Sequence, residues 1–222
     1  MTSHTKDPNR MAPGLRGLYV IVDPEFSPAG VLATAEAALK GGARILQWRD
    51  KSREKGLQLP ECREIARMCE NYDSLLIVND HADLALAAGA HGLHVGQKDL
   101  PVDEARSIMA SHSLIGTSNA TLGEAIESQE LGADYIAVGR MFPTATKTNT
   151  RPAGLETLRA VRRVVKVPLV AIGGITEGNV EAVVEAGADL IAVISSVTDD
   201  PNPVCAARRL TTRIFAALEK YR

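Results

Sequence analysis

Two aspartates within residues 74–100 have the residue type and spacing that metal binding requires. Asp80 follows one apolar run, and Asp99 follows a second at 92–96. If the two runs are neighbouring parallel strands, both carboxylates lie at the carboxyl ends of those strands, where α/β folds bind their ligands. Carboxylate oxygens suit a hard cation such as Mg²⁺. The stretch therefore predicts a magnesium site formed by these two aspartates.

A second set of polar residues lies at the end of the predicted strand 43–49. Because side chains alternate along a strand, three polar residues share one face: Gln47, Arg49 and Lys51. Trp48 takes the opposite face and is expected to pack outward beneath the helices. Burying two cations without partners would cost several kcal/mol. Their partners are therefore an anion, the two aspartates, or the acids of a purely structural ion-pair cluster.

The predicted loop 139–150 is rich in hydroxyl groups and carries Lys147. Hydroxyl and amide groups donate hydrogen bonds to phosphate oxygens, and an ammonium group adds positive charge. A threonine-rich segment is also typical of an ordinary surface loop. Its place at the end of a strand, together with Arg49 and Lys51, favours a phosphate or a diphosphate as its ligand.

Small residues follow the last two predicted strands. Gly173 and Gly174 follow the seventh, and Ser195 and Ser196 follow the eighth. Barrels of alternating strands and helices commonly bind phosphate at this place, through backbone N–H groups and a helix N-terminus. The alternative is that the glycines only allow close packing at a strand end.

Eight apolar segments of strand length alternate with helical segments. The predicted strands are 17–22, 43–49, 75–78, 93–95, 114–117, 135–138, 169–172 and 190–194. The predicted helices are 31–40, 53–71, 82–88, 101–111, one capped by Thr121, 155–165, one opening at Thr176, and 204–220. A Gly-Ala pair precedes four strands, at 42–43, 89–90, 132–133 and 187–188, where glycine with a positive φ would end each helix.

This alternation predicts an α/β protein with the architecture of a (β/α)8 TIM barrel. The alternative is an open doubly wound sheet, but eight units fit the barrel, and no dinucleotide-binding glycine fingerprint follows the first strand. No linker-like stretch interrupts the series, so we expect a single barrel domain over residues 15–222. Residues 1–14 are polar and predict a flexible N-terminal segment.

Composition argues against several classes of partner. Of 222 residues, 45% are hydrophobic and 23% are charged, as in ordinary globular proteins. A net charge of −2 offers no field for nucleic acid or an anionic membrane, and no apolar run is long enough to span a bilayer. The three cysteines lack metal-ligand spacing, which favours a cytoplasmic location. We expect small-molecule substrates; the oligomeric state stays open, a homo-oligomer included.

Residues 74–100 contain three histidines, and we assign them no catalytic or ligand-binding role. His94 lies in the middle of a strand and is expected to be a hydrogen-bonded interior histidine. His81 and His91 flank a predicted helix and are expected at its ends. The strand ends suggest no Ser-His-Asp or Cys-His arrangement.

Seven short motifs occur in an order and at a spacing that resemble one known family. They are Gln47-Trp48-Arg49-Asp50-Lys51, Val78-Asn79-Asp80, Gly96-Gln97-Lys98-Asp99-Leu100, Ile115-Gly116-Thr117-Ser118, Phe142-Pro143-Thr144-Ala145-Thr146-Lys147, Ile172-Gly173-Gly174-Ile175 and Val193-Ile194-Ser195-Ser196. From residue 17 to residue 197 the chain resembles the thiamine phosphate synthases, also called thiamine-phosphate pyrophosphorylases. The resemblance implies a transferase of thiamine biosynthesis on a (β/α)8 barrel.

The resemblance also implies a reaction and a set of site residues. A hydroxymethylpyrimidine diphosphate loses pyrophosphate, and the nitrogen of a thiazole phosphate attacks its methylene carbon. By position, the catalytic residues would be Arg49, Lys51 and Lys147. The pyrimidine diphosphate would be bound by Gln47, Trp48, Arg49, Asp50, Lys51, Asn79, Ser118 and Lys147. The thiazole phosphate would be bound by Thr144, Ala145, Thr146, Gly174, Ile194 and Ser195, and Mg²⁺ by Asp80 and Asp99.

Two rival functions stay open. A thiazole tautomerase on the same barrel would bind a similar thiazole phosphate, but it would need an acid-base group and no diphosphate clamp. The other rival is a non-catalytic sensor of phosphorylated ligands. The chain departs from the family pattern at Trp48, at Lys98, which lowers negative charge near the metal, and at Arg140, which adds a cation before the phosphate loop.

Overall fold

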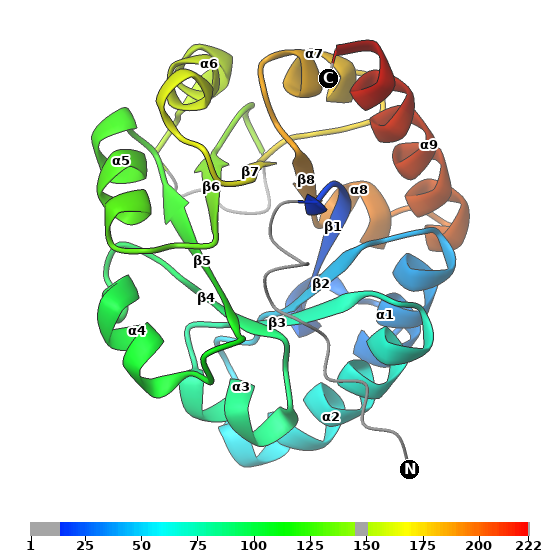
Figure 1. Ribbon diagram of the computed structural model, residues 1–222. Coiled ribbons are helices and arrows are strands. Elements are labelled where there is room, and N and C mark those ends of the chain that lie inside the picture. The colour runs from blue at the N-terminus through cyan, green and yellow to red at the C-terminus, as the bar shows by residue number, and fades with distance from the viewer. Residues whose placement is uncertain (1–13, 145–150, 222) are drawn as a thin grey trace.

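Eight parallel strands form a closed barrel in which every strand pairs with its neighbours in sequence order (Figure 1). The computed structural model describes residues 14–144 and 151–221. The strands are β1 (Gly17–Val22), β2 (Ile45–Trp48), β3 (Leu75–Asn79), β4 (Gly92–Val95), β5 (Leu114–Asn119), β6 (Tyr135–Gly139), β7 (Leu169–Ile172) and β8 (Leu190–Val193). β1 pairs with β8 and closes the ring, so the predicted TIM barrel is confirmed and the open sheet is excluded.

Helices surround the barrel and connect the end of each strand to the start of the next (Figure 1). They are the 3-10 helix η3 (Pro24–Phe26), α1 (Val31–Lys40), α2 (Lys55–Asn71), α3 (Ala82–Ala88), α4 (Val102–Ile108), α5 (Leu122–Glu130), α6 (Gly154–Val164), α7 (Val180–Glu185), α8 (Ser195–Thr198) and α9 (Pro203–Tyr221). None of the helices in the described part of the chain is long and apolar enough to cross a membrane.

Local sequence signals account for several helix ends. Thr121 caps α5 and forms the predicted capping box with Glu124, whose side chain accepts a hydrogen bond from the Thr121 backbone in return. The four Gly-Ala turns all carry glycine at positive φ; Gly89, for example, ends α3 at φ 67° in the left-handed region. This conformation lets the chain leave a helix and enter the next strand within a few residues.

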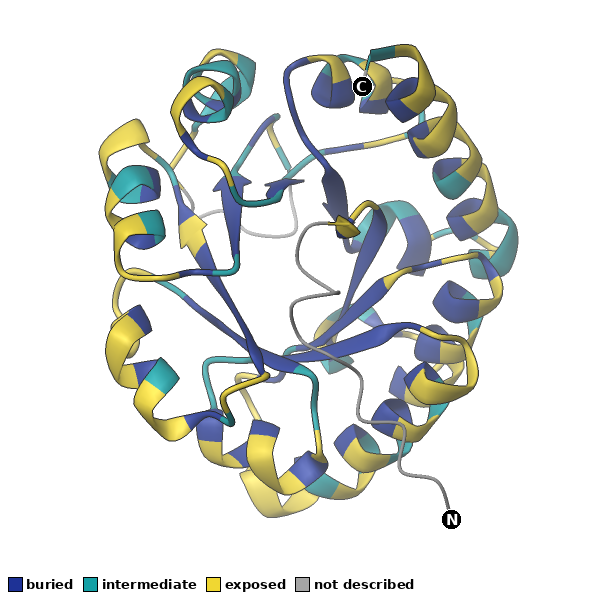
Figure 2. Cartoon of the chain, in the orientation of Figure 1, coloured by how far each residue is buried: buried dark blue, intermediate teal, exposed yellow. Residues whose placement is uncertain are grey.

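Two apolar layers hold the barrel together, and Figure 2 shows the buried strands at its centre. The inner layer fills the barrel and includes Tyr19, Ile45 and Tyr135. The outer layer lies between the strands and the helices and includes Trp48 and Cys62. Burial raises the pKa of the Cys62 thiol to about 12, so this cysteine packs rather than reacts.

Two local predictions were wrong or incomplete. The seventh helix begins at Val180, not at Thr176, because the intervening residues form a turn. The short helices η3 and α8 were not predicted, since each is only three or four residues long. Residues 1–13 lie outside the described residues, and the predicted flexible N-terminal segment stays a prediction.

Candidate active site

The predicted site residues gather at the carboxyl ends of the strands, in two regions. The first region, here called the charged cluster, follows β1 to β4 and consists of Asp23, Arg49, Lys51, Asp80 and Asp99. The second is a cavity of about 490 Å³ at the ends of β4 to β8.

Asp80 is held at the end of β3 by its backbone. Its φ of 63° lies in the left-handed region, which aspartate and asparagine tolerate better than most residues. Its backbone N–H donates a hydrogen bond to the His94 carbonyl at 2.9 Å. Its carboxylate contacts the Lys51 ammonium at 3.0 Å. Asn79, the last residue of β3, stands directly before it.

Asp99 lies beside Asp80, as the sequence predicts. The Gly96 N–H donates to the Asp99 carboxylate at 2.8 Å. Burial raises the pKa of Asp99, and the neighbouring Asp80 carboxylate raises it further, while the Gly96 hydrogen bond opposes both. Two adjacent carboxylates of this kind are stabilised by a divalent cation between them. Within residues 14–144 and 151–221 there is no cluster of three or more His, Cys, Asp or Glu side chains that could hold a metal ion.

The partner of Arg49 is an acid that was not among the predicted site residues. The Arg49 guanidinium pairs with Asp23, the residue that follows β1, and Asp23 is almost fully buried. A usable signal was present, since Asp23 follows its strand as Asp80 follows β3. The Arg49 Nε–H is buried and, among the described residues, has no hydrogen-bond partner. One donor of this cation is therefore unsatisfied in that part of the chain.

Trp48 and Asp50 have side-chain contacts within the loop after β2 and with helix α2. The Trp48 indole is buried between β2 and α2, where its Nε1–H donates to Gln58 at 2.9 Å and the Arg53 guanidinium lies 5.6 Å from the ring centroid. The Asp50 carboxylate accepts hydrogen bonds from the backbone of Ser52 and from the backbone and side chain of Arg53. These contacts order the loop after β2, and the predicted role of the two residues in substrate binding stays a prediction.

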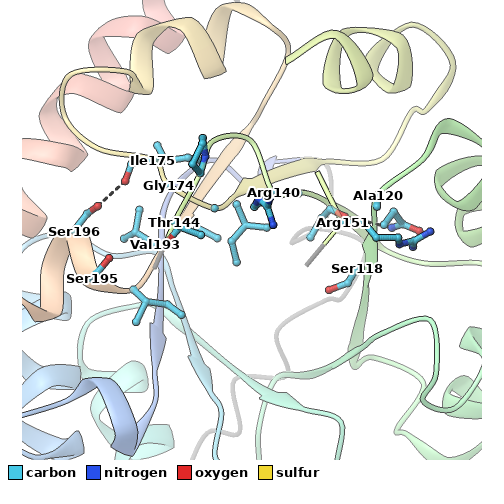
Figure 3. A pocket seen from close by; sticks show the side chains of 18 of the residues that line it. Ser118, Ala120, Arg140, Thr144, Arg151, Gly174, Ile175, Val193, Ser195 and Ser196 are labelled. Atoms are coloured by element: carbon cyan, nitrogen blue, oxygen red, sulfur yellow. Dashed lines mark hydrogen bonds between the residues drawn. The ribbon is translucent and has the colours of Figure 1, made fainter. Parts of the chain in front are cut away.

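The cavity is lined mainly by small residues and backbone (Figure 3). Five of the predicted substrate-binding residues line it: Ser118, Thr144, Gly174, Ile194 and Ser195. Gly174 has a φ of 64°, and a Cβ there would lie 2.6 Å from the Pro143 carbonyl oxygen. No larger residue fits this position without moving the chain.

Two arginines and two amides of the cavity wall were not among the predicted binding residues. They are Arg140, Arg151, Gln97 and Asn119. Arg151 pairs with Glu124 at 2.6 Å. Gln97 and Asn119 lie at the ends of β4 and β5, so the rule that located the aspartates could have found them. Ala145, Thr146 and Lys147 lie outside the described residues, and their predicted roles stay predictions.

A chain of hydrogen bonds runs through the barrel beneath both regions. The Gln47 Nε2–H donates to the Tyr19 hydroxyl at 2.6 Å, and the hydroxyls of Tyr19 and Tyr135 lie 3.2 Å apart. His94 contacts Tyr135 through Nδ1 at 3.0 Å and Ser118 through Nε2 at 2.8 Å. The prediction that His94 is a hydrogen-bonded interior histidine is confirmed.

Comparison with known proteins places the chain in a family. The family described as thiamine monophosphate synthase matches residues 18–197. The chain belongs to the thiamine monophosphate synthase family. This match spans all eight strands and both regions of the barrel mouth, so the resemblance suggested by the seven motifs is confirmed.

Individual relatives agree with this family. The chain is 43% identical to the thiamine-phosphate synthase of Thioalkalivibrio sulfidiphilus over 88% of its own length and 94% of the relative. It is 41% identical to a thiamine biosynthesis bifunctional protein of Geobacter sulfurreducens, of which it spans only 39%. The structure of thiamine phosphate pyrophosphorylase from Pyrococcus furiosus superimposes with a TM-score of 0.86 at 36% identity, covering 93% of this chain and 98% of that one.

Proposed function

We propose that this protein joins a hydroxymethylpyrimidine diphosphate to a thiazole phosphate, giving thiamine phosphate and pyrophosphate. As a member of the thiamine monophosphate synthase family, the chain is an enzyme, a transferase of thiamine biosynthesis. The structural observation that carries the proposal is the division of the barrel mouth into a charged cluster and a small-residue cavity. Two anionic substrates need two such sites, side by side.

The charged cluster is the proposed site of the diphosphate. Arg49 and Lys51 supply positive charge, and Asp80 and Asp99 are the proposed ligands of Mg²⁺. When bound there, Mg²⁺ supplies charge that stabilises the departing pyrophosphate. Two carboxylates fit this ion, because Mg²⁺ is usually held by one or two carboxylates and by substrate phosphates. Lys147 is proposed to add a cation from the loop after β6.

The cavity is the proposed site of the thiazole phosphate, except that Ser118, on β5 at the side of the cavity next to β4, is proposed to contact the diphosphate. The backbone at Gly174 and the start of α8 at Ser195 offer N–H groups to an anion, as in other barrels of this type. The apolar side chain of Ile194 and the small Ala192 leave room for a flat ring next to that anion. Thr144 is proposed to contact the phosphate, together with Ala145 and Thr146.

The chemistry needs positioning and charge rather than a general base. The aminopyrimidine ring donates electrons toward its methylene carbon while the bond from that carbon to the diphosphate oxygen breaks. The electron pair of the broken bond leaves with pyrophosphate, which Arg49 and Lys51 stabilise. The thiazole nitrogen then forms the new C–N bond with its own lone pair. Because that nitrogen carries no proton to be removed, no catalytic histidine is required.

The experiment mixes both heterocyclic phosphates with the protein, with and without Mg²⁺, and follows thiamine phosphate and pyrophosphate. We expect equal amounts of the two products, and only when Mg²⁺ is present. Proton exchange on the thiazole ring without coupling would instead support a tautomerase. Binding of both compounds with no chemistry would support a sensor.

A further inference from the structure

The hydrogen-bonded chain in the barrel connects five strands and has a direction. Its members are Gln47 on β2, Tyr19 on β1, Tyr135 on β6, His94 on β4 and Ser118 on β5. The first four are buried, whereas Ser118 is exposed and lines the cavity. The chain therefore begins inside the barrel and ends at the site.

The first half of the chain determines how protons can be arranged along it. An amide nitrogen can only donate, so the Tyr19 oxygen accepts from Gln47. Burial raises the pKa of both tyrosines well above the ordinary value, so each hydroxyl keeps its proton. The Tyr19 proton is then available to the Tyr135 oxygen, 3.2 Å away.

The second half follows from the first. When the Tyr135 oxygen accepts from Tyr19, its own proton is directed to Nδ1 of His94 at 3.0 Å. A neutral imidazole with an accepting Nδ1 carries its proton on Nε2, which then donates to the Ser118 oxygen at 2.8 Å. The Ser118 oxygen then accepts a hydrogen bond from His94. Its own O–H proton can still be donated to a ligand in the cavity.

Packing holds the middle of the chain in place. The Tyr135 ring lies against Gly116, where a Cβ would be only 1.9 Å from the ring, so β5 has room for it only at a glycine. The His94 ring stacks on the Tyr135 ring, with centroids 5.6 Å apart and planes inclined by 24°. Neither ring can turn freely, and the hydrogen-bond geometry is preserved without substrate.

We propose that His94 is a positioning residue, held as the Nε2–H tautomer, which makes the Ser118 hydroxyl a hydrogen-bond donor to an oxygen of the substrate diphosphate. The proposal rests on the proposed function for the identity of that substrate. Its physical content is that Ser118 is oriented before the substrate arrives. A hydroxyl that need not reorient loses less entropy on binding.

The first test measures the tautomer in the protein without substrate. Long-range ¹H–¹⁵N spectra of the full chain distinguish a protonated from an unprotonated ring nitrogen, and the His94→Gln variant identifies the His94 signals. We expect protonated Nε2 and unprotonated Nδ1, with partial loss of this preference in Tyr135→Phe. Protonated Nδ1, or two protonated nitrogens, in the wild type would overturn the proposal. This result stands whether or not the protein makes thiamine phosphate.

The second test measures how far Ser118 depends on Tyr135, using a double-mutant cycle on binding of inorganic pyrophosphate with Mg²⁺. Ser118→Ala is expected to weaken binding about tenfold in the wild type, and clearly less in a Tyr135→Phe background. Tyr72→Phe is the matched control, since it removes an exposed tyrosine hydroxyl from α2's end. Equal losses from Ser118→Ala in both backgrounds would overturn the coupling. Thermal unfolding of each variant shows whether the barrel is intact.

Discussion

The two halves of the barrel mouth are built to hold anions by different means. The charged cluster uses long side chains whose charges are already paired, Lys51 with Asp80 and Arg49 with Asp23. The cavity uses backbone, hydroxyls and glycines such as Gly174. Side-chain charges need partners when no ligand is present and must exchange them on binding. A backbone site needs no such exchange, but it tolerates no added Cβ.

The largest effect on activity is expected when the charged cluster loses a carboxylate. Asp80→Asn keeps the side-chain shape and suits the left-handed φ of 63°, yet it removes a carboxylate from the cluster. We expect kcat/KM to fall by about 10²–10³-fold, with the fold intact. Asp83→Asn is the matched control, because Asp83 also pairs with a lysine, Lys55, but on the outer surface. Full turnover of Asp80→Asn with Mg²⁺ present would remove this residue from the mechanism.

A smaller effect on activity is expected when a Cβ is added to the cavity at Gly174. Gly174→Ala places a Cβ 2.6 Å from the Pro143 oxygen and forces alanine to a φ of 64°. We expect the KM for thiazole phosphate to rise at least about tenfold and stability to fall by about 1–3 kcal/mol. Gly178→Ala is the control, since the nearest atom to its Cβ would be 3.8 Å away. An unchanged KM would show that the anion binds elsewhere.

Asp50 orders the loop after β2 but is not part of the charged cluster. Its loss should therefore lower stability more than activity. Burial alone would raise the pKa of Asp50, but hydrogen bonds from Ser52 and Arg53 lower it below its ordinary value. We expect Asp50→Asn to reduce the free energy of unfolding by about 1–3 kcal/mol at neutral pH. The difference from wild type should shrink as the pH falls below about 4, where the Asp50 carboxylate of the unfolded and then of the folded chain gains a proton. Urea titrations at several pH values test this, and a difference that does not depend on pH would contradict it.

The smallest effect on activity is expected at Trp48. Trp48→Phe keeps an aromatic ring in the outer layer but loses the hydrogen bond to Gln58. Stability should fall by about 1 kcal/mol, while the KM for the pyrimidine diphosphate stays within about twofold. A tenfold rise in that KM at unchanged stability would show that the indole takes part in substrate binding.

Much of the fold could be predicted from the sequence because its local signals are strong. β1, α1 and α3 have their predicted bounds, since glycine, proline or histidine interrupts the apolar pattern at their ends. The two regions of the mouth also followed from one rule, that polar residues after parallel strands share one face. The same rule predicted that Lys51 and Asp80 lie close together, and they form an ion pair.

What the sequence could not predict depends on which strands become neighbours and at what register. Asp23 meets Arg49 because Val22 and Trp48 are register partners, a relation that no local pattern encodes. Tyr19 and Tyr135 meet only when the barrel closes, since β1 and β6 are not adjacent strands. The contacts of Asp50 are local, to Ser52 and Arg53, but the sequence alone does not show whether the carboxylate accepts from them or from a ligand.

The most direct test of two separate anion sites is a crossed calorimetric titration. Each substrate alone, with Mg²⁺, is titrated into wild type, Asp80→Asn and Gly174→Ala. Asp80→Asn should weaken the pyrimidine diphosphate by at least about tenfold and leave the thiazole phosphate within about twofold, and Gly174→Ala should do the reverse. If either substitution weakened both substrates equally in folded protein, the division of the barrel mouth into two sites would be wrong.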